Sequence, residues 1–571
     1  MTRPILTGLI CLVVLTACGG REPPHAEPAG PPPDGPTPGG RADTDQPARE
    51  EAVAPVIAEA LRKQSADAAA TGRTLESRPA PGHPLAPPSG EVRDRENYRH
   101  VEANPVRLAA EDPVSTFSID VDTAAYSNVR RLLSRGALPP SDAVRVEELI
   151  NYFSYDYPAP EADDAFEVVT ELGPAPWHPG RKLLHIGIQG QRLAVDELPP
   201  ANLVFLIDVS GSMRSPDKLD LLKASMKLLL NRLDADDRVA IAVYAGAAGA
   251  VLEPTPGDRH ATIEAAIDRL AAGGSTNGGA GIQLAYALAR QGFIADGINR
   301  VILATDGDFN VGTTSEERLE DLVARQRASG VALTVLGFGT GNYNDALMQR
   351  LAQSGNGHAA YVDTLNEARK VLVDELSSTL AIIASDVKIQ LEFNPAVVAE
   401  YRLLGYETRL LDREDFNDDR VDAGDIGAGH SVTALYEITL HDSPARRIDP
   451  LRYGAAPEPP PSARAGELAF LRLRYKSPGA AGSRLIERPL RLADGRRALA
   501  DTSRDFRFAA AVAGFGALLR GGAGLEDFAY DDVIELAGAA RGPDPFGYRA
   551  EFLGLVRTAQ ALGGPAAVSR R

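Results

Sequence analysis

Short apolar runs alternate with helical spacing through the middle of the chain. Residues 202–207 begin with Asn202 and are otherwise apolar. Such a run is typical of a strand buried on both faces of a sheet. Leu219, Leu222, Met226 and Leu229 then recur every three or four residues, which predicts a helix with one apolar face. Further strands are predicted at 239–244, 300–304 and 331–337, and further helices near 259–270, 280–291, 316–328, 345–352 and 365–380. This alternation predicts an α/β domain, a doubly wound parallel sheet with helices on both faces.

Strand patterns also occur on both sides of this domain. Residues 166–170 and 183–188 precede it, and residues 387–393, 431–440 and 468–475 follow it. Neither group alone is large enough to form a covered sheet. We therefore expect the two groups to form one β-sandwich into which the α/β domain is inserted.

Helical patterns mark both ends of the folded body. Tyr126, Val129 and Leu133 indicate a first helix, and residues 144–150 indicate a second. From residue 505 to about residue 562 the apolar spacing is helical again. The chain therefore combines an N-terminal helical segment and a helical C-terminal region with the sandwich and the α/β domain.

The first residues have the features of an export signal. Arg3 precedes an apolar stretch that is too short to span a bilayer. The stretch ends in Leu15-Thr-Ala-Cys18, which resembles the processing site of bacterial lipoproteins; the alternative is an ordinary secretory signal with a chance cysteine. The resemblance implies lipidation of Cys18, with acyl chains as the only membrane contact. Gly19 is similar to the residue found in lipoproteins of the outer membrane, so we expect a cell-envelope protein anchored there, facing either the periplasm or the surface.

A long polar segment separates this signal from the folded body. It is dense in Pro, Gly and charged residues and poor in aromatic residues, so we expect a disordered tether. The predicted parts are a signal peptide at 1–17, the tether at 18–97, an N-terminal helical region at 98–160, sandwich strands at 161–198 and 383–480, the α/β domain at 199–382 and the helical C-terminal region at 481–571.

Composition narrows the classes of function. The 571 residues allow three or four domains of ~150 residues each. Lys and Arg number 60 and Asp and Glu number 78, for a net charge of −18; such an acidic chain has no electrostatic footprint for nucleic acid. Cys11 and Cys18 are the only cysteines, so the folded body has no disulfide and no thiolate metal site.

Oxygen-bearing side chains follow three of the predicted strands and helices. Asp208, Ser210 and Ser212 come directly after the strand at 202–207, Thr276 follows a helix, and Asp306 ends the strand at 300–304. Because the carboxyl ends of parallel strands meet at one edge of a sheet, we expect these residues to lie together. Such a set of hard oxygen ligands suits Mg²⁺, with Mn²⁺ or Ca²⁺ as alternatives.

These three loops together resemble the metal-ion-dependent adhesion site of von Willebrand factor type A domains. The resemblance implies that Ser210, Ser212 and Thr276 bind the metal directly, while Asp208 and Asp306 act mostly through water. A wider resemblance links the chain to one bacterial family of lipoproteins that carry this domain. It rests on the segments 117–131, 145–153, 339–345 and 415–430 and on the helical C-terminal region.

The ligand set predicts a binding protein. Neutral hydroxyl ligands leave the metal much of its charge, and a carboxylate of an unidentified protein partner, from Asp or Glu, can fill an open coordination position. We expect the rim that selects this partner to contain Asp308, Asn310, Asn342 and Tyr343. The alternatives are a metal-dependent hydrolase or phosphate-binding enzyme, which would need basic residues where the loops offer only Arg214, and a structural scaffold. We expect no enzymatic activity.

Two further acidic motifs have competing interpretations. Asp120-Val-Asp122-Thr123 imitates a phosphatase nucleophile loop, but a helix follows at once, so we interpret it as a helix cap. The acidic loop at 412–425 begins like a calcium loop, but Arg420 stands where such a loop needs Gly and Ile426 where it needs Glu. We favour a solvated turn there over a second metal site.

Overall fold

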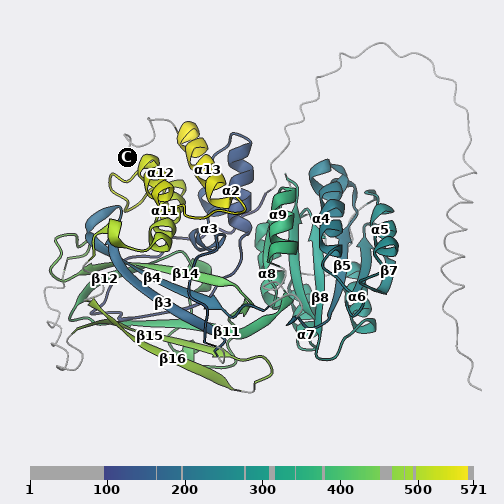
Figure 1. Cartoon of the computed structure of the whole chain (residues 1–571), viewed down its shortest axis with the longest axis horizontal. Helices are drawn as coiled ribbons and strands as arrows, with labels where there is room; N and C mark the ends of the chain where they lie inside the picture. The colour runs from purple at the N-terminus through teal and green to yellow at the C-terminus, as the bar shows by residue number, and fades with distance from the viewer. Residues whose placement is uncertain are drawn as a thin grey trace, which may run out of the picture. The chain divides into compact units, whose positions relative to one another are not determined.

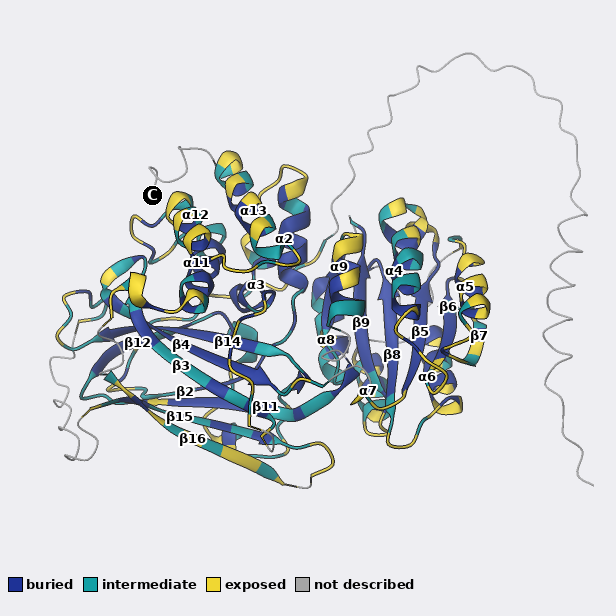
Figure 2. Cartoon of the chain, in the orientation of Figure 1, coloured by how far each residue is buried: buried dark blue, intermediate teal, exposed yellow. Residues whose placement is uncertain are grey.

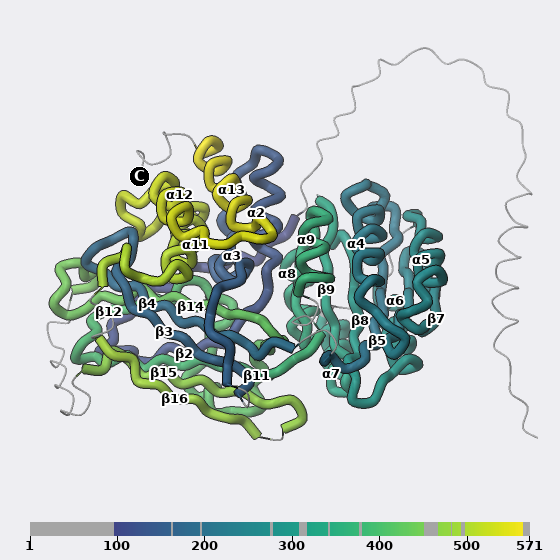
Figure 3. Tube along the Cα trace, in the orientation of Figure 1, coloured from purple at the N-terminus to yellow at the C-terminus, as the bar shows by residue number. Residues whose placement is uncertain are grey.

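The computed structural model describes residues 96–161, 164–193, 197–274, 278–307, 316–340, 343–375, 380–449, 466–480, 482–492 and 497–563. The predicted signal peptide, Cys18 and most of the predicted tether therefore lie outside the described residues. The chain first contributes strands to the β-sandwich and forms two α-helices, then completes the α/β domain and returns to the sandwich, as the path in Figure 3 shows.

The α/β domain is built on a six-stranded sheet with the order β10-β9-β8-β5-β6-β7. Figure 1 shows its neighbouring strands β5 and β8. Its strands are β5 (Ala201–Asp208), β6 (Arg238–Tyr244), β7 (Ala248–Pro256), β8 (Ile298–Thr305), β9 (Ala332–Phe338) and β10 (Ala359–Val362). Its helices are α4 (Leu221–Leu230), α5 (His260–Asp268), α6 (Gly278–Gln291), α7 (Glu316–Arg327), α8 (Asp345–Ser354) and α9 (Leu365–Arg369). All pairs are parallel except β6 with β7. The doubly wound fold is confirmed, and β7 and β10 are additions that the sequence pattern did not predict.

Alternation along β5 explains why helices cover both faces of this sheet. Leu203 and Phe205 belong to the core that includes α4, α5 and α9, whereas Val204 and Leu206 belong to the core that includes α6, α7 and α8. Successive residues of a strand point to opposite faces. A strand with apolar residues at every position therefore needs a helical layer on each side.

The sandwich takes strands from both sides of the α/β domain. One sheet has the order β1-β12-β14-β4-β3, and the other has the order β13-β11-β15-β16 with β2 beside β11. The strands are β1 (Arg107–Leu108), β2 (Val114–Ser118), β3 (Phe166–Ala175), β4 (His178–Gly190), β11 (Ile382–Phe393), β12 (Val398–Leu404), β13 (Gly424–Gly427), β14 (Ser431–Leu440), β15 (Glu467–Lys476) and β16 (Ser483–Arg491). β14 pairs with β4 antiparallel, with Val432 opposite Ile188. The predicted insertion of the α/β domain into a sandwich is confirmed.

Helices from the two ends of the chain share a separate core. They are α2 (Ala124–Ser134), α3 (Val146–Asn151), α11 (Arg504–Leu519), α12 (Tyr530–Ala539) and α13 (Tyr548–Gly563). Their buried faces meet each other and one sheet of the sandwich (Figure 2). Trp177, between β3 and β4, and Leu435 of β14 belong to the same core. The N-terminal segment is not purely helical as expected, because β1 and β2 each add a strand to one of the two sheets. Among the described helices, none combines the length and the apolar character that crossing a bilayer requires.

Candidate metal centre

The first loop of the predicted site leaves the carboxyl end of β5. Every residue of β5 is buried, and Asp208 at its end has 0% exposure. Asp208 Oδ1 accepts a hydrogen bond of 2.8 Å from the Ser210 backbone N–H. The Ser210 and Ser212 hydroxyl oxygens lie 2.9 Å apart. A buried carboxylate and two hydroxyls therefore converge within one tight loop.

The second loop is held against the first by two backbone hydrogen bonds. The Gly273 N–H donates to the Val209 carbonyl at 2.7 Å, and the Gly211 N–H donates to the Gly274 carbonyl at 3.0 Å. Gly274 has φ +94°, a conformation that favours glycine. Thr276 lies outside the described residues, so its place among the ligands stays a prediction, but the chain enters its segment directly beside the two serines.

The third loop brings the second carboxylate to the same edge. β8 is the parallel neighbour of β5, with Ala304 opposite Ile207, and Asp306 follows at the end of β8 with 0% exposure. The Thr305 hydroxyl donates to Asp208 Oδ2 at 3.3 Å. We call Asp208, Ser210, Ser212 and Asp306 the metal edge; the sheet brings these four predicted residues together.

The surroundings of Asp208 combine burial with hydrogen-bond donors. Burial raises the pKa of Asp208 to about 6, although the Ser210 backbone and the Tyr244 hydroxyl donate hydrogen bonds that lower it. Desolvation disfavours the charged form of a carboxyl group. A cation bound at the metal edge would favour the ionised form again.

The geometry of the metal edge fits a small, hard divalent ion. An octahedral ion with metal–oxygen distances of about 2.1 Å places adjacent ligand oxygens about 3 Å apart. The 2.9 Å between the Ser210 and Ser212 hydroxyl oxygens matches this spacing. Ser212 is exposed, so the edge is also open to a ligand from outside the protein.

Lys218 belongs to this edge, and the sequence reasoning missed it. Its Nζ donates to Asp306 Oδ2 at 2.8 Å, and its side chain is 7% exposed. It lies on a short π-helix, Pro216–Asp220, which leads into α4. The available signal was its position four residues before Leu222, on the buried face of that helix, where a lysine needs an acidic partner.

The predicted rim is only partly described, and one of its residues is buried. Tyr343 is 1% exposed. Its ring packs edge-on against the ring of Tyr361, with the two ring centroids 4.6 Å apart, and its hydroxyl donates to Asp345 Oδ1 at 3.2 Å. Tyr343 therefore offers no surface to a partner, and the rim prediction is wrong for this residue. Asp308, Asn310 and Asn342 lie outside the described residues and stay predictions.

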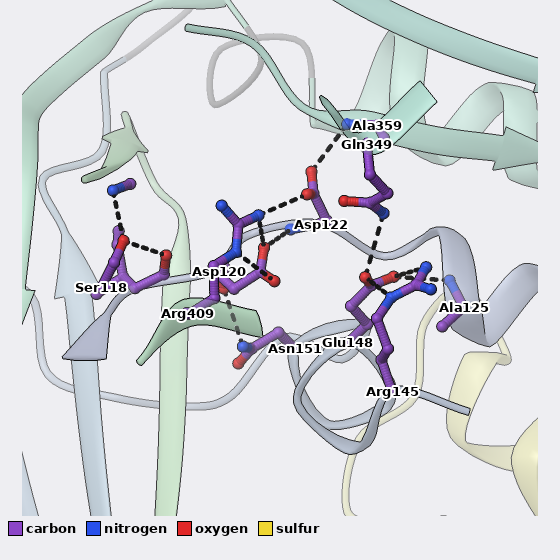
Figure 4. A network of polar contacts seen from close by, with 12 residues as sticks. Ser118, Asp120, Asp122, Ala125, Arg145, Glu148, Asn151, Gln349, Ala359 and Arg409 are labelled. Carbon is purple, nitrogen blue, oxygen red and sulfur yellow. Dashed lines mark hydrogen bonds and ion pairs between the residues drawn. The ribbon is translucent and has the colours of Figure 1, made fainter. Parts of the chain in front are cut away.

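The motif Asp120-Val-Asp122 forms ion pairs and does not cap a helix (Figure 4). Arg409 donates from Nε and Nη2 to the two oxygens of Asp120 at 3.0 and 2.9 Å, and from Nη2 to Asp122 at 2.9 Å. The Ala359 N–H of β10 donates to Asp122 Oδ1 at 2.8 Å. Thr123 is the N-cap of α2 and makes no side-chain capping bond. The capping interpretation is wrong because both carboxylates bind elsewhere: they accept hydrogen bonds from Arg409, which is distant in the sequence, and Asp122 also accepts one from the backbone of β10.

Glu148 completes this second group of acids. One carboxylate oxygen from each of Asp120, Asp122 and Glu148 lies within 4.8 Å of the others. Glu148 also accepts hydrogen bonds from Arg145 and, at 2.7 Å, from the Ala125 N–H. We call these three carboxylates the acidic cluster; with guanidinium groups bound to all of them, it is a structural ion-pair network.

Lysine and arginine side chains also donate hydrogen bonds to oxygens of the acidic loop at 412–425. Lys388 Nζ donates to the carbonyls of Asp415 and Asp418 at 3.0 and 2.6 Å. Arg420 donates to the Asp418 carboxylate at 2.6 Å. The ammonium and guanidinium groups bind loop oxygens that a calcium ion would need as ligands, which favours the turn over a second metal site.

Family models match most of the described chain. The model of the von Willebrand factor type A domain matches residues 202–374, a model described as von Willebrand factor matches residues 92–185, and the model of the C-terminal part of "Uncharacterized protein YfbK" matches residues 378–562. The matches follow the division into an α/β domain, its preceding segment and the returning sandwich with its helices.

Individual proteins are also similar to this chain over long stretches. YfbK of Escherichia coli K12 is 48% identical over 472 residues, which cover 81% of each chain. The protein sll0103 of Synechocystis is 30% identical over 190 residues, covering 33% of this chain and 44% of its own. A solved structure of a von Willebrand factor type A protein from Catenulispora acidiphila covers 70% of this chain and 91% of its own, with 15% identity and a TM-score of 0.39.

Proposed function

This chain belongs to the YfbK family of bacterial proteins with a von Willebrand factor type A domain, and from this premise we propose that it is a cell-envelope protein that binds a partner through a divalent metal. Domains of this type commonly mediate protein–protein interactions through a metal-ion-dependent adhesion site. The observation that carries the proposal is the pair of serine hydroxyls, 2.9 Å apart, beside the buried Asp208 at the carboxyl edge of the sheet.

The proposed roles of the ligands follow from the charges of their side chains. Ser210, Ser212 and Thr276 supply neutral oxygens to the ion, and Asp208 and Asp306 hold its water ligands. Neutral ligands leave the ion with net positive charge, which attracts a carboxylate from an Asp or Glu of a protein partner. The exposed side of Ser212 gives that carboxylate its access. Mg²⁺ suits the spacing of the oxygens, with Mn²⁺ and Ca²⁺ as alternatives.

The proposed location rests on Cys18. A processed and acylated Cys18 would anchor the protein in the outer membrane, with the polar segment before residue 96 as a spacer. Labelled palmitate is expected to enter the wild-type protein and not the Cys18→Ala variant. Label in the variant would contradict the proposed anchor.

The metal is tested by calorimetric titration of Mg²⁺ into the purified full-length protein. Thr276→Ala, Ser210→Ala and Ser212→Ala should each weaken binding by about tenfold or more, because an octahedral shell tolerates few substitutes for an oxygen ligand. Asp306→Ala should weaken it further, because a negative charge is lost as well. Ser215→Ala, three residues after Ser212, is the matched control and should leave the affinity unchanged.

Partner binding is tested by capture from envelope extracts with Mg²⁺ or with a chelator. Proteins that are retained only with Mg²⁺, and lost with Thr276→Ala, would support the adhesion site. Equal Mg²⁺ affinity in the wild type and in Thr276→Ala, with both proteins folded, would mean that the site is wrongly placed.

A further inference from the structure

A lysine ammonium is built into the metal edge. Lys218 Nζ lies 2.8 Å from Asp306 Oδ2, and the two side chains are 7% and 0% exposed. A surface lysine would move freely in solvent, but this one is covered. Its Nζ is therefore held beside Asp306 and does not point into solvent.

The path of the Lys218 side chain is fixed by another loop. Gly339 follows β9 with φ +73°, and a Cβ atom at this position would overlap Cγ, Cδ and Cε of Lys218. The Tyr361 hydroxyl donates to the Gly339 carbonyl and holds this turn in place. Only a glycine leaves room for the lysine stem here, so the fold provides a slot that directs the ammonium to Asp306.

This ammonium has two electrostatic consequences. An ionised carboxylate that is buried without a counter-charge is costly, and Lys218 supplies such a charge to Asp306 when no metal is present. A divalent ion at the same edge is repelled by the ammonium, which weakens its binding. Two carboxylates, one ammonium and a divalent ion together keep one net positive charge, whereas without the ammonium they would be neutral. The remaining charge favours an acidic partner.

We propose that Lys218 is an internal counter-cation of the metal edge: it stabilises Asp306 in the metal-free protein and lowers the affinity for the metal, in exchange for a more positive site once the metal is bound. This inference rests on the proposed metal-binding function. Lys218 acts through Asp306 and is a positioning residue.

The test compares Lys218→Met with the wild type, in the full-length protein, by calorimetric titration of Mg²⁺ and by thermal unfolding. Methionine keeps the stem in its slot and removes the charge. Mg²⁺ affinity should rise about tenfold, because a like charge near the ion is gone. The metal-free variant should unfold at a lower temperature, and excess Mg²⁺ should raise its unfolding temperature by more than it raises that of the wild type.

Lys227→Met is the matched control. Lys227 lies on α4, close along the chain to Lys218, but its ion pair with Asp268 is exposed, with side chains 39% and 60% exposed. Its removal should leave the Mg²⁺ affinity within about twofold of the wild type, because solvent screens exposed charges. Lys218→Gln keeps a hydrogen-bond donor without the charge and should behave like Lys218→Met.

The outcomes separate the inference from the function on which it rests. A wild-type protein that binds no Mg²⁺ would overturn the proposed function itself. A wild type that binds Mg²⁺, with equal or weaker binding by Lys218→Met, would overturn the role of Lys218 alone. Wild-type affinity in Lys218→Gln would show that the hydrogen bond matters and the charge does not. Failure of both variants to fold in excess Mg²⁺ would also overturn the inference, because the metal should replace the ammonium beside Asp306.

Discussion

The metal edge and the acidic cluster are two groups of buried carboxylates with different counter-charges. At the metal edge, the described cation is one lysine ammonium, bonded to one oxygen of Asp306, and two serine hydroxyls lie beside the acids. In the acidic cluster, Arg409 forms ion pairs with Asp120 and Asp122, and Arg145 forms an ion pair with Glu148. Both begin with an aspartate in a short loop, so the loop motif alone does not distinguish a metal site from an ion-pair network.

The difference lies in the geometry of the cations. A guanidinium is planar and donates several hydrogen bonds in fixed directions, so it can satisfy two carboxylates at once. Arg409 does this with three hydrogen bonds of 2.9 to 3.0 Å. An ion that entered the acidic cluster would have to displace such a group. We conclude that the guanidinium groups of Arg409 and Arg145 together keep a metal out of the acidic cluster.

The largest expected effect is on the acidic cluster. Arg409→Met should reduce the free energy of unfolding by about 3–5 kcal/mol, because it leaves two buried carboxylates without their cation. Asp120 and Asp122 are 2% and 3% exposed as side chains. Urea denaturation of the variant and the wild type gives the difference directly.

The control for this prediction is Arg420→Met. Arg420 also pairs with an aspartate, Asp418, but its side chain is 89% exposed, so its loss should cost less than about 1 kcal/mol. Mg²⁺ and Ca²⁺ should not restore the stability of Arg409→Met, because Arg145 still binds Glu148, the third carboxylate of the cluster. Restoration by either ion would mean that the acidic cluster is a latent metal site and that the comparison fails.

Glu147, next to Glu148, provides a pH-dependent test. It is 0% exposed, and its carboxylate oxygens accept no hydrogen bond from another residue in the described part of the chain. Burial, with Glu407 and Asp120 nearby, raises its pKa to about 8. The folded state therefore holds a proton between the unfolded pKa of about 4.5 and the folded value of about 8, so the stability that this group contributes falls as the pH rises through that window.

Glu147→Gln should remove this dependence. At about pH 5 the variant and the wild type should be nearly equal, because the wild-type carboxyl group is neutral, and at about pH 8 the variant should be more stable by about 3–4 kcal/mol. Urea denaturation at both pH values measures the change. The exposed Glu535 gives the control Glu535→Gln, which should differ little at either pH. An equal response of both variants would show that burial of Glu147 is not the cause.

Sequence patterns were enough for most of the fold because each element carries its own signal. The apolar runs of β5, β6, β8 and β9 are buried on both faces, and strands before and after the α/β domain were too few to stand alone. β7 was not predicted because only one of its nine residues is buried, so it has no clear apolar pattern. β1 has two residues and pairs with β12 almost three hundred residues later, with Arg107 opposite Tyr401; no local pattern specifies such a partner.

The same limit applies to the two groups of carboxylates. The residues of the metal edge could be predicted because each ends a strand or follows it in a loop, and parallel strands bring those ends together. Arg409 and Lys218 could not be placed in this way. Arg409 is 289 residues from Asp120 and Lys218 is 88 residues from Asp306. Their contacts arise from packing between distant elements, which spacing along the chain does not report.

The third largest expected change in stability is at the loop that leads to Thr276. Gly274→Ala should cost about 1–2 kcal/mol, because φ +94° is strained for a residue with a side chain. The added Cβ would have only ordinary contacts of 3.5 Å, so the cost comes from the backbone. Mg²⁺ binding should also weaken, since residues after 274 would shift. Gly273→Ala, with open space around its Cβ, is the matched control; an equal loss in both would contradict the argument.

The smallest expected change in stability is at the metal edge itself, and it is the sharpest contrast with Arg409→Met. Ser212 is exposed and its hydroxyl contacts the Ser210 hydroxyl, so Ser212→Ala without metal should change the free energy of unfolding by less than about 0.5 kcal/mol. With Mg²⁺ at about one hundred times the wild-type Kd, the wild type gains about 2.7 kcal/mol from binding. A variant that binds tenfold more weakly would gain about 1.4 kcal/mol less. The loss of unfolding free energy in Ser212→Ala should therefore appear only when Mg²⁺ is added. The loss in Arg409→Met should be the same with and without Mg²⁺. Urea denaturation with Mg²⁺ and with a chelator measures both, and a Ser212→Ala defect of the same size in the two conditions would mean that this serine serves packing and not the metal.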